Sequence, residues 1–177
     1  MQAGYNYSMP ASKSTKSLDD MFCSIERTLS VVGERWTFLI LRETLLNGLT
    51  KFADFEKILG IAPNVLADRL ATLVSAGVLE KREYKEEGSR PRFSYHPTPK
   101  GEELKLVLAA LQQWGDNNIP PDCGVTMVRQ TVEGDRPVRV GFIDDADQPR
   151  SLEEVKILPT ESYPFEARAA RLAGASV

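Results

Sequence analysis

The 177-residue sequence has two cysteines, one histidine and no long apolar run. Cys23 and Cys123 cannot build the disulfide framework of a small secreted protein, and together with His96 they supply too few ligands for a four-ligand zinc site. Stretches such as Phe38–Leu41 are too short to cross a bilayer, and the N-terminus lacks the apolar middle region of a signal peptide. We therefore expect a cytosolic protein without a membrane segment, a metal or another cofactor.

The sequence also lacks a recognisable catalytic constellation. It contains no Ser/His/Asp set, no paired carboxylates and no glycine-rich loop that would cradle a phosphate. Asp144, Asp145 and Asp147 share one polar turn, but they specify too few oxygen ligands for a cation. We therefore predict that the protein is not an enzyme.

Charge is unevenly distributed along the chain. The net charge is -3, which taken alone argues against a nucleic-acid partner. Residues 1–115 carry 15 Lys and Arg against 14 Asp and Glu, whereas residues 116–177 carry 7 against 11. The acidity thus belongs to the C-terminal part, and a locally basic face on the N-terminal part remains compatible with DNA.

The chain divides into three predicted segments. Residues 1–17 are polar and aperiodic, typical of a flexible arm. Residues 18–118 hold the helical pattern and a hairpin, and residues 119–177 form an acidic, β-rich extension of unknown role. Within the extension, two β-rich runs (125–132 and 138–143) predict a second hairpin. Residues 151–158 fit a strand or a helix, and residues 166–172 a short helix.

The first two predicted helices are amphipathic. The first begins near Leu18 and ends at Gly33, and its apolar face consists of Phe22, Ile25, Leu29 and Val32. The second ends at the breaker pair Asn47-Gly48. Its expected buried residues are Trp36, Leu39, Ile40 and Leu46, and its expected exposed residues are Arg42 and Glu43.

A short helix and a longer one follow. Thr50 is positioned to cap a helix that Gly60 ends, and Phe52, Phe55 and Leu59 form its apolar face. Pro63 suits the first turn of the next helix, and Gly77 closes it. This longer helix places Leu66, Leu70, Leu73 and Val74 on one face and Asn64, Asp68, Arg69 and Thr72 on the other.

The period then changes to that of a β-hairpin. Strands over 78–84 and 92–96 flank a polar loop, and Pro97 ends the second strand. Thr98-Pro99 then starts a fifth helix, whose apolar stripe consists of Leu104, Val107, Leu108, Leu111 and Trp114. The fold class is therefore mainly α with a β-hairpin wing (α+β), a winged helix-turn-helix. Its target is either the DNA major groove or a protein partner, because helix pairs of this kind also act as docking adaptors.

Residues 22–118 resemble the HxlR-type winged-helix transcription regulators, which are related to the MarR group. The segments that carry the resemblance cover slightly over half the chain: CSIERTLSVVGERWTFLILRETLLNG, KFADFEKILGIAPNVLADRLATLVSAGVLEKREY, PRFSYHPTPKG and LQQWGD. Asn64 stands where a basic residue is frequent in the family, and Pro97 where an apolar residue is common. The resemblance implies a homodimer through the first and fifth helices that binds a palindromic operator on double-stranded DNA.

Candidate DNA contacts lie on the fourth helix, before the third helix and in the hairpin loop. Arg69 and Asn64 are candidates for base or phosphate contacts. The alternatives are an internal ion pair of Arg69 with Asp68, Glu56 or a neighbour, and a capping role for Asn64. The full candidate set is Lys51, Asn64, Asp68, Arg69, Lys85, Arg90 and Arg92. Glu86 and Glu87 beside the loop cations oppose phosphate binding.

Cys23 occupies the start of the first helix, where thiol-sensing members of this family carry their reactive cysteine. A helix N-terminus favours the thiolate, and Arg27 follows one turn later. Two interpretations stay open: a redox-sensing thiol and an unreactive one, with Cys123 a weaker candidate for a resolving partner. Trp36 and Trp114 fit either the core or a pocket for a small effector.

Overall fold

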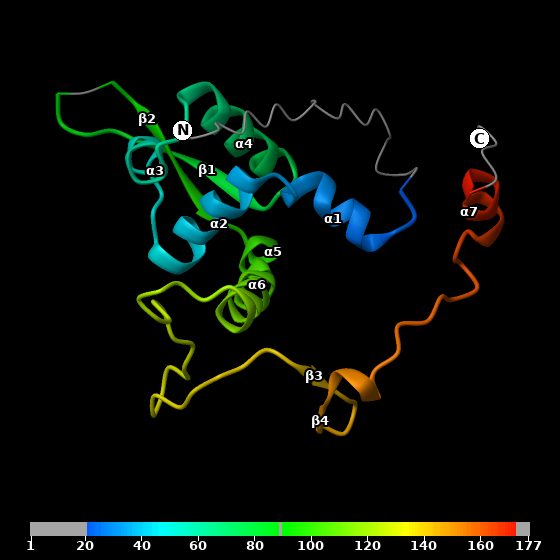
Figure 1. The fold of residues 1–177 in the computed structure, drawn as a ribbon. Coiled ribbons are helices and arrows are strands. Elements are labelled where there is room, and N and C mark those ends of the chain that lie inside the picture. Colours follow the sequence, from blue (N-terminus) through cyan, green and yellow to red (C-terminus); the bar gives the residue numbers. More distant parts are fainter. Residues whose placement is uncertain (1–20, 89, 173–177) are drawn as a thin grey trace, which may run out of the picture.

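The computed structural model describes residues 21–88 and 90–172. The predicted N-terminal arm, residues 1–17, lies outside the described residues. Six helices and one hairpin form the body of the molecule (Figure 1). In chain order they are α1 (Ser24–Val32), α2 (Arg35–Asn47), α3 (Phe52–Leu59), α4 (Pro63–Ser75), β1 (Leu79–Tyr84), β2 (Arg92–Pro97), α5 (Pro99–Glu102) and α6 (Leu104–Asn118).

A single apolar core lies between α2, α3, α4 and the hairpin. Leu66, Leu70 and Leu73 recur every three or four residues, so that they share the face of α4 that packs on α2 and α3. Phe55 of α3 is fully buried against them. The predicted apolar faces of both helices of the helix-turn-helix are therefore confirmed.

The predicted orientation of α2 is wrong at two positions. Glu43 is buried instead of exposed, and Leu46 is exposed instead of buried. α2 contacts α3, α4, α6 and β2, so that more than one of its faces is covered and no single stripe describes its burial. The Glu43 carboxylate is satisfied there because it accepts hydrogen bonds from Arg42 Nε (2.8 Å) and Asn47 Nδ2 (2.6 Å).

The hairpin is the predicted wing. β1 and β2 pair antiparallel, from Leu79 opposite Pro97 to Tyr84 opposite Arg92. The residues before α3 add a short third segment, because the Tyr95 amide donates to the Thr50 carbonyl at 2.8 Å and Lys51 forms a bridge with Ser94. Thus the wing and the start of α3 form one connected unit, and the mixed winged-helix fold is confirmed.

The end of α4, the wing and the start of α5 are closely packed and joined by hydrogen bonds. The Thr98 hydroxyl caps α5 by accepting from the Gly101 amide (3.1 Å), as predicted, and donates to the Gly77 carbonyl (2.7 Å). A Cβ on Gly101 would lie 2.2 Å from the Val78 carbonyl oxygen, so this position requires glycine. The single predicted fifth helix is divided into α5 and α6 at Glu103, where the Leu106 amide donates back only three residues.

The extension beyond α6 has little regular structure. It contains β3 (Phe142–Ile143), β4 (Pro149–Arg150), a 3₁₀ turn (Leu152–Glu154) and α7 (Phe165–Leu172). The two β-rich runs predicted to form a hairpin are joined by a turn at Gly134, but their ladder is reduced to the bridge between Gln130 and Pro137, because proline has no amide hydrogen to donate. The strand content is therefore smaller than the sequence predicts, whereas the predicted short terminal helix is confirmed as α7.

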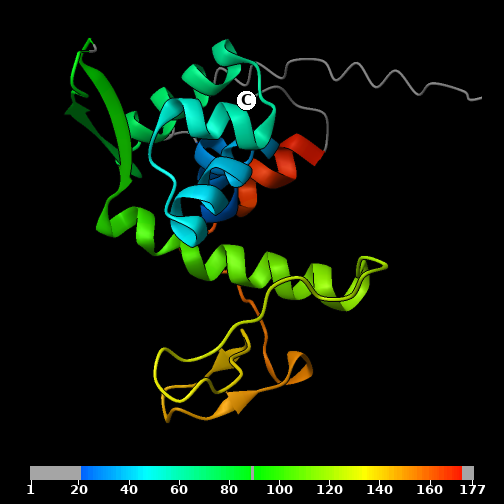
Figure 2. The same cartoon turned by 90° about the vertical axis from the view of Figure 1, so that its left-hand side faces the viewer.

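Figure 1 and Figure 2 show how the parts are arranged. α3, α4 and the wing lie on one side of α6, and the segment that carries β3 and β4 lies on the other. Within the described ranges, no helix is both long enough and apolar enough to cross a membrane.

Candidate nucleic-acid interface

α4 presents a solvent-facing strip beside the wing. Gly60, with φ +60°, ends α3, and Pro63 begins α4 three residues later. The exposed positions of α4 include Asn64, Ala67, Asp68 and Ala71, spaced i, i+3, i+4 and i+7. The polar side of this helix faces outward, as the sequence predicts, and its breadth suits a major groove. The two alanines were not among the sequence-based candidates, although alanine is a known partner of the thymine methyl group.

Arg69 lies at the edge of this strip and is only partly exposed. Its side chain is 29% exposed, and Nη2 lies 3.7 Å from Glu34 Oε2 at the start of α2. Its Nε is buried and has no hydrogen-bond partner among the described residues. An internal ion pair of Arg69 is therefore present, but its partner is Glu34, which the sequence reading did not name, instead of Asp68 or Glu56.

The wing loop is tied to the start of α3 by an ion pair. Lys51 Nζ lies 2.7 Å from Glu86 Oε1 and 5.1 Å from the centroid of the Tyr84 ring. The hydrogen bond from Lys51 lowers the pKa of Glu86, and the charge of Arg92 lowers it further. The same pair raises the pKa of Lys51. The structure thus brings the candidates Lys51 and Arg92 together around one carboxylate.

The remaining wing candidates are exposed. Lys85 and Arg90 follow β1 in the loop, and Arg92 opens β2. Lys57 on α3 is also exposed, a cation that the sequence reading passed over because it is not on the fourth helix or the wing. The interface therefore carries cations on the wing and on α3, and mostly small side chains on α4.

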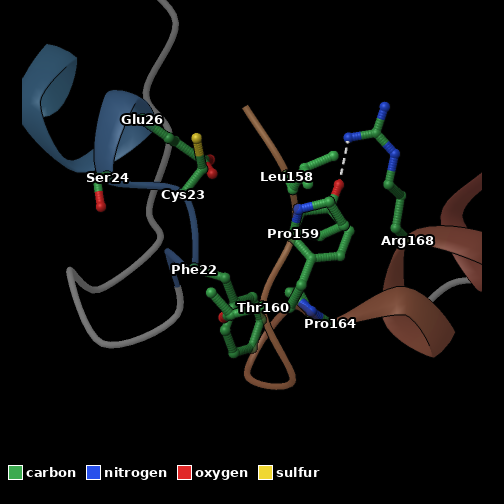
Figure 3. Close-up of a pocket in the computed structure, with 10 residues that line it drawn as sticks. Phe22, Cys23, Ser24, Glu26, Leu158, Pro159, Thr160, Pro164 and Arg168 are labelled. Carbon is green, nitrogen blue, oxygen red and sulfur yellow. Dashed lines mark hydrogen bonds between the residues drawn. The ribbon is translucent and has the colours of Figure 1, made fainter. Parts of the chain in front are cut away.

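Cys23 lines a cavity at the far end of the molecule from the wing. The residue is exposed immediately before α1, and its carbonyl accepts from the Arg27 amide. The cavity has a volume of about 360 Å³ and lies between the start of α1 and residues 158–168 (Figure 3). Its basic residue is Arg168, which donates a hydrogen bond to the Tyr163 hydroxyl at 2.8 Å. Arg27, the expected helper of the thiol, instead lines a groove between α1 and α6.

α1 and α6 expose broad apolar faces. Of the residues predicted for the α1 face, only Val32 is buried, whereas Phe22, which precedes the helix, Ile25 and Leu29 are exposed. On α6, Leu108 is buried, but Leu111 and Trp114 are exposed, and Trp114 reaches 60% exposure. Trp36, by contrast, is partly buried and packs against the core. The apolar stripes of both helices are thus only partly used inside one chain.

Other chemistry is not evident in the described part of the chain. Residues 21–88 and 90–172 contain no group of three or more His, Cys, Asp or Glu side chains placed to hold a metal ion. Asp144 of the acidic turn accepts a hydrogen bond from the Gln148 amide, pairs with Arg150 and accepts a hydrogen bond from the Ala146 amide, contacts that lower its pKa. Its carboxylate is therefore used to close the turn.

Known proteins share the winged-helix part of this chain. Residues 31–123 match the family model described as HxlR-like helix-turn-helix. The uncharacterized HTH-type transcriptional regulator Rv3095 of Mycobacterium tuberculosis is 38% identical over 97 residues, which are 55% of this chain and 60% of that protein. This chain therefore spans less than two thirds of that relative.

Solved structures extend the similarity. PA1607, a proposed transcription factor, is 31% identical with a TM-score of 0.69, and the match covers 82% of this chain and 100% of that one. The redox regulator HypR in its oxidized form is 25% identical with a TM-score of 0.50, over 56% of this chain and 100% of that one. Because the family model spans more than half of the residues, the chain belongs to the HxlR-like helix-turn-helix family.

Proposed function

We propose that the protein is a transcription regulator that binds double-stranded DNA as a homodimer. The observation that carries the proposal is the outward strip of α4, with Asn64 and Asp68 at its polar positions and the cationic wing beside it. In this proposal the strip enters the major groove, where the asparagine side chain suits adenine and the carboxylate suits cytosine. The wing contacts phosphates or the adjacent minor groove.

The homodimer is the second part of the proposal. It is supported by the exposed stripes of α1 and α6, which lie away from the wing and are larger than an isolated domain needs. A two-fold axis between them repeats α4 once in each copy. The matching DNA is a palindrome whose half-sites lie about 34–36 Å apart, one turn of the duplex.

A thiol switch at Cys23 is the third part. The thiol is exposed, lies at the start of a helix of the proposed dimer interface and lines a cavity. One structural relative, HypR, is a redox regulator. Modification of Cys23 would change the spacing of the two α4 helices and so the DNA affinity.

Salt dependence tests the DNA-binding part directly. Fluorescence anisotropy with duplex DNA from immediately upstream of the gene should show an affinity that falls about 10³- to 10⁵-fold between 50 and 200 mM salt, if 6–10 phosphates are engaged. A scrambled duplex is the control for sequence specificity. Alanine at Arg90 or Arg92 should weaken binding to both duplexes and reduce the salt slope by about one unit.

A protein-docking adaptor gives the opposite result. Such a protein would bind neither duplex with a steep salt dependence, and the wing substitutions would leave its weak DNA binding unchanged. That outcome would overturn the proposed function.

A further inference from the structure

We propose that residues 119–172 form a clasp that closes over α1 and α6 of a second copy of this chain. The inference rests on the proposed homodimer and adds to it the surface that the extension contributes. The buried core residues of the described chain run from Met21 to Leu108, and none lies in the extension.

Large apolar side chains of the extension are exposed instead. Ile143 is 68% exposed and Ile157 is 91% exposed, values that leave most of their area in contact with water. The exposed set is Ile119, Val125, Met127, Val128, Val132, Val138, Phe142, Ile143, Leu152, Ile157, Leu158, Phe165 and Leu172. Scattered exposed apolar residues are ordinary, but such a density over one segment is typical of a surface that another chain covers.

The extension is nevertheless attached to α6 at a defined register. The side-chain amide of Gln113 donates to the Val140 carbonyl and accepts from the Val140 amide, both at 2.8 Å. Arg129 pairs with Asp116 at 3.3 Å, and each side chain is less than one quarter exposed. These contacts attach the extension to its own α6 through Arg129 and Val140, while the apolar side chains of the extension stay exposed.

The far end of the extension returns to α1. Leu158 and Arg168 lie across the cavity at the start of α1 from Phe22 and Cys23 (Figure 3), and Tyr163 also lines it. Between the two attachments, the segment with β3 and β4 lies on the side of α6 that faces away from α3, α4 and the wing (Figure 1 and Figure 2). The extension therefore connects the two helices whose apolar stripes are exposed.

A second copy is the occupant that this arrangement fits. The extension is attached to α6 through Gln113 and borders the start of α1 at the cavity, so that its exposed apolar side chains belong to a segment bound to both helices whose apolar faces are exposed. In a two-fold dimer the same surface meets itself, and the clasp of each chain covers the helices of the other. The match of PA1607 to 82% of this chain supports a folded extension, because residues 21–118 alone supply little more than half of the chain.

Isotope-mixed cross-linking of the full chain tests the geometry. Natural-abundance and ¹⁵N-labelled protein are unfolded together, refolded and treated with an amine-reactive cross-linker, and peptides joining Lys156 to Lys100 or Lys105 are analysed by mass spectrometry. We expect cross-linked peptides with one light and one heavy member. If Lys156 joins these lysines only within one isotope, or not at all, the clasp is overturned.

Paired substitutions test the energetics. Ile143→Asp and Ile157→Asp should each shift the monomer–dimer midpoint, measured by analytical ultracentrifugation, at least about tenfold toward higher concentration, as for loss of an important interface residue. Ile58→Asp on α3, where the isoleucine is 57% exposed on the opposite side of α6, should leave the midpoint unchanged. Circular dichroism verifies that each variant is folded.

The outcomes separate the clasp from the proposed function. Unchanged midpoints for both clasp variants overturn the clasp while the dimer stands. A wild-type chain that is monomeric at all concentrations overturns the clasp and the dimer together. DNA binding is measured independently by its salt dependence, so its failure is recognised separately from either result.

Discussion

Lys51 Nζ lies 2.7 Å from Glu86 Oε1, so that the first residue before α3 and the tip region of the wing are joined by an exposed ion pair. In the proposed complex, this carboxylate competes with DNA phosphates for the lysine. The pair therefore restrains the wing in the free protein and opposes phosphate binding by Lys51.

Removal of the Glu86 charge should strengthen DNA binding. We expect Glu86→Gln to increase affinity several-fold at low salt, because it removes a repulsive charge and releases Lys51 for phosphate contact. Glu87→Gln is the matched control, since Glu87 is exposed and has no ion pair among the described residues. The gain should be larger for Glu86→Gln than for the control in anisotropy titrations; equal gains would contradict a specific role for the ion pair.

The ion pair between Lys51 and Glu86 also predicts how the effect of Glu86→Gln on DNA affinity depends on pH. The pKa of Glu86 is lowered from 4.5 by Lys51, so that the carboxylate is ionised well below neutral pH. The stabilisation from the pair is present above the ordinary pKa and is lost as the pH falls through the lowered one. We expect the affinity ratio of Glu86→Gln to wild type to be constant between about pH 6 and 8. A ratio that changes in this range would show that another titrating group controls the pair.

Substitutions of Arg69 and of Glu34 distinguish two roles of Arg69, a contact with DNA and a structural ion pair with Glu34. Because Arg69 is 29% exposed beside the α4 strip, we expect Arg69→Ala to weaken operator binding about tenfold or more without changing the dimer. Glu34→Ala should not weaken binding, since it removes only the internal partner. A similar loss in both variants, together with lower stability in urea, would assign Arg69 to holding α4 against α2.

Gly101 controls the junction between the wing and α5. A Cβ there would lie 2.2 Å from the backbone oxygen of Val78, so Gly101→Ala should lower the free energy of unfolding by about 1–3 kcal/mol and displace the wing. Gly115→Ala in α6 is the control, because a Cβ at Gly115 meets nothing within 4 Å; it should be neutral or stabilise by up to about 1 kcal/mol. Urea denaturation compares the two, and an unchanged Gly101→Ala would contradict the clash.

Cys23 and Cys123 are both exposed. The Cys123→Ser variant is therefore a matched control for the Cys23→Ser variant. We expect Cys23→Ser to retain DNA affinity but to lose its response to quinones or peroxide, whereas Cys123→Ser should respond like the wild type. Anisotropy with and without oxidant measures the response. A Cys23→Ser protein that still responds would remove the sensing hypothesis.

The local elements of the winged helix could be predicted from the sequence. Apolar residues at helical spacing identify α3 and α4, glycine and proline mark their ends, and alternation identifies the wing. These signals are strong because each depends on neighbours within a few residues. The outward strip around Asn64 and Asp68 follows directly from them.

Packing between segments that are distant in the sequence decided which polar side chains are buried and which charged side chains are paired. Glu43 is buried, Arg69 turns toward Glu34, and Lys51 pairs with Glu86, which is 35 residues away in the sequence. The same holds for the extension, whose apolar residues predict a hairpin, whereas the structure leaves these residues exposed and forms only the Gln130–Pro137 bridge between the two runs. Periodicity indicates which side of a segment is apolar, but which other surface covers that side depends on how distant segments meet, and one chain's pattern does not contain that information.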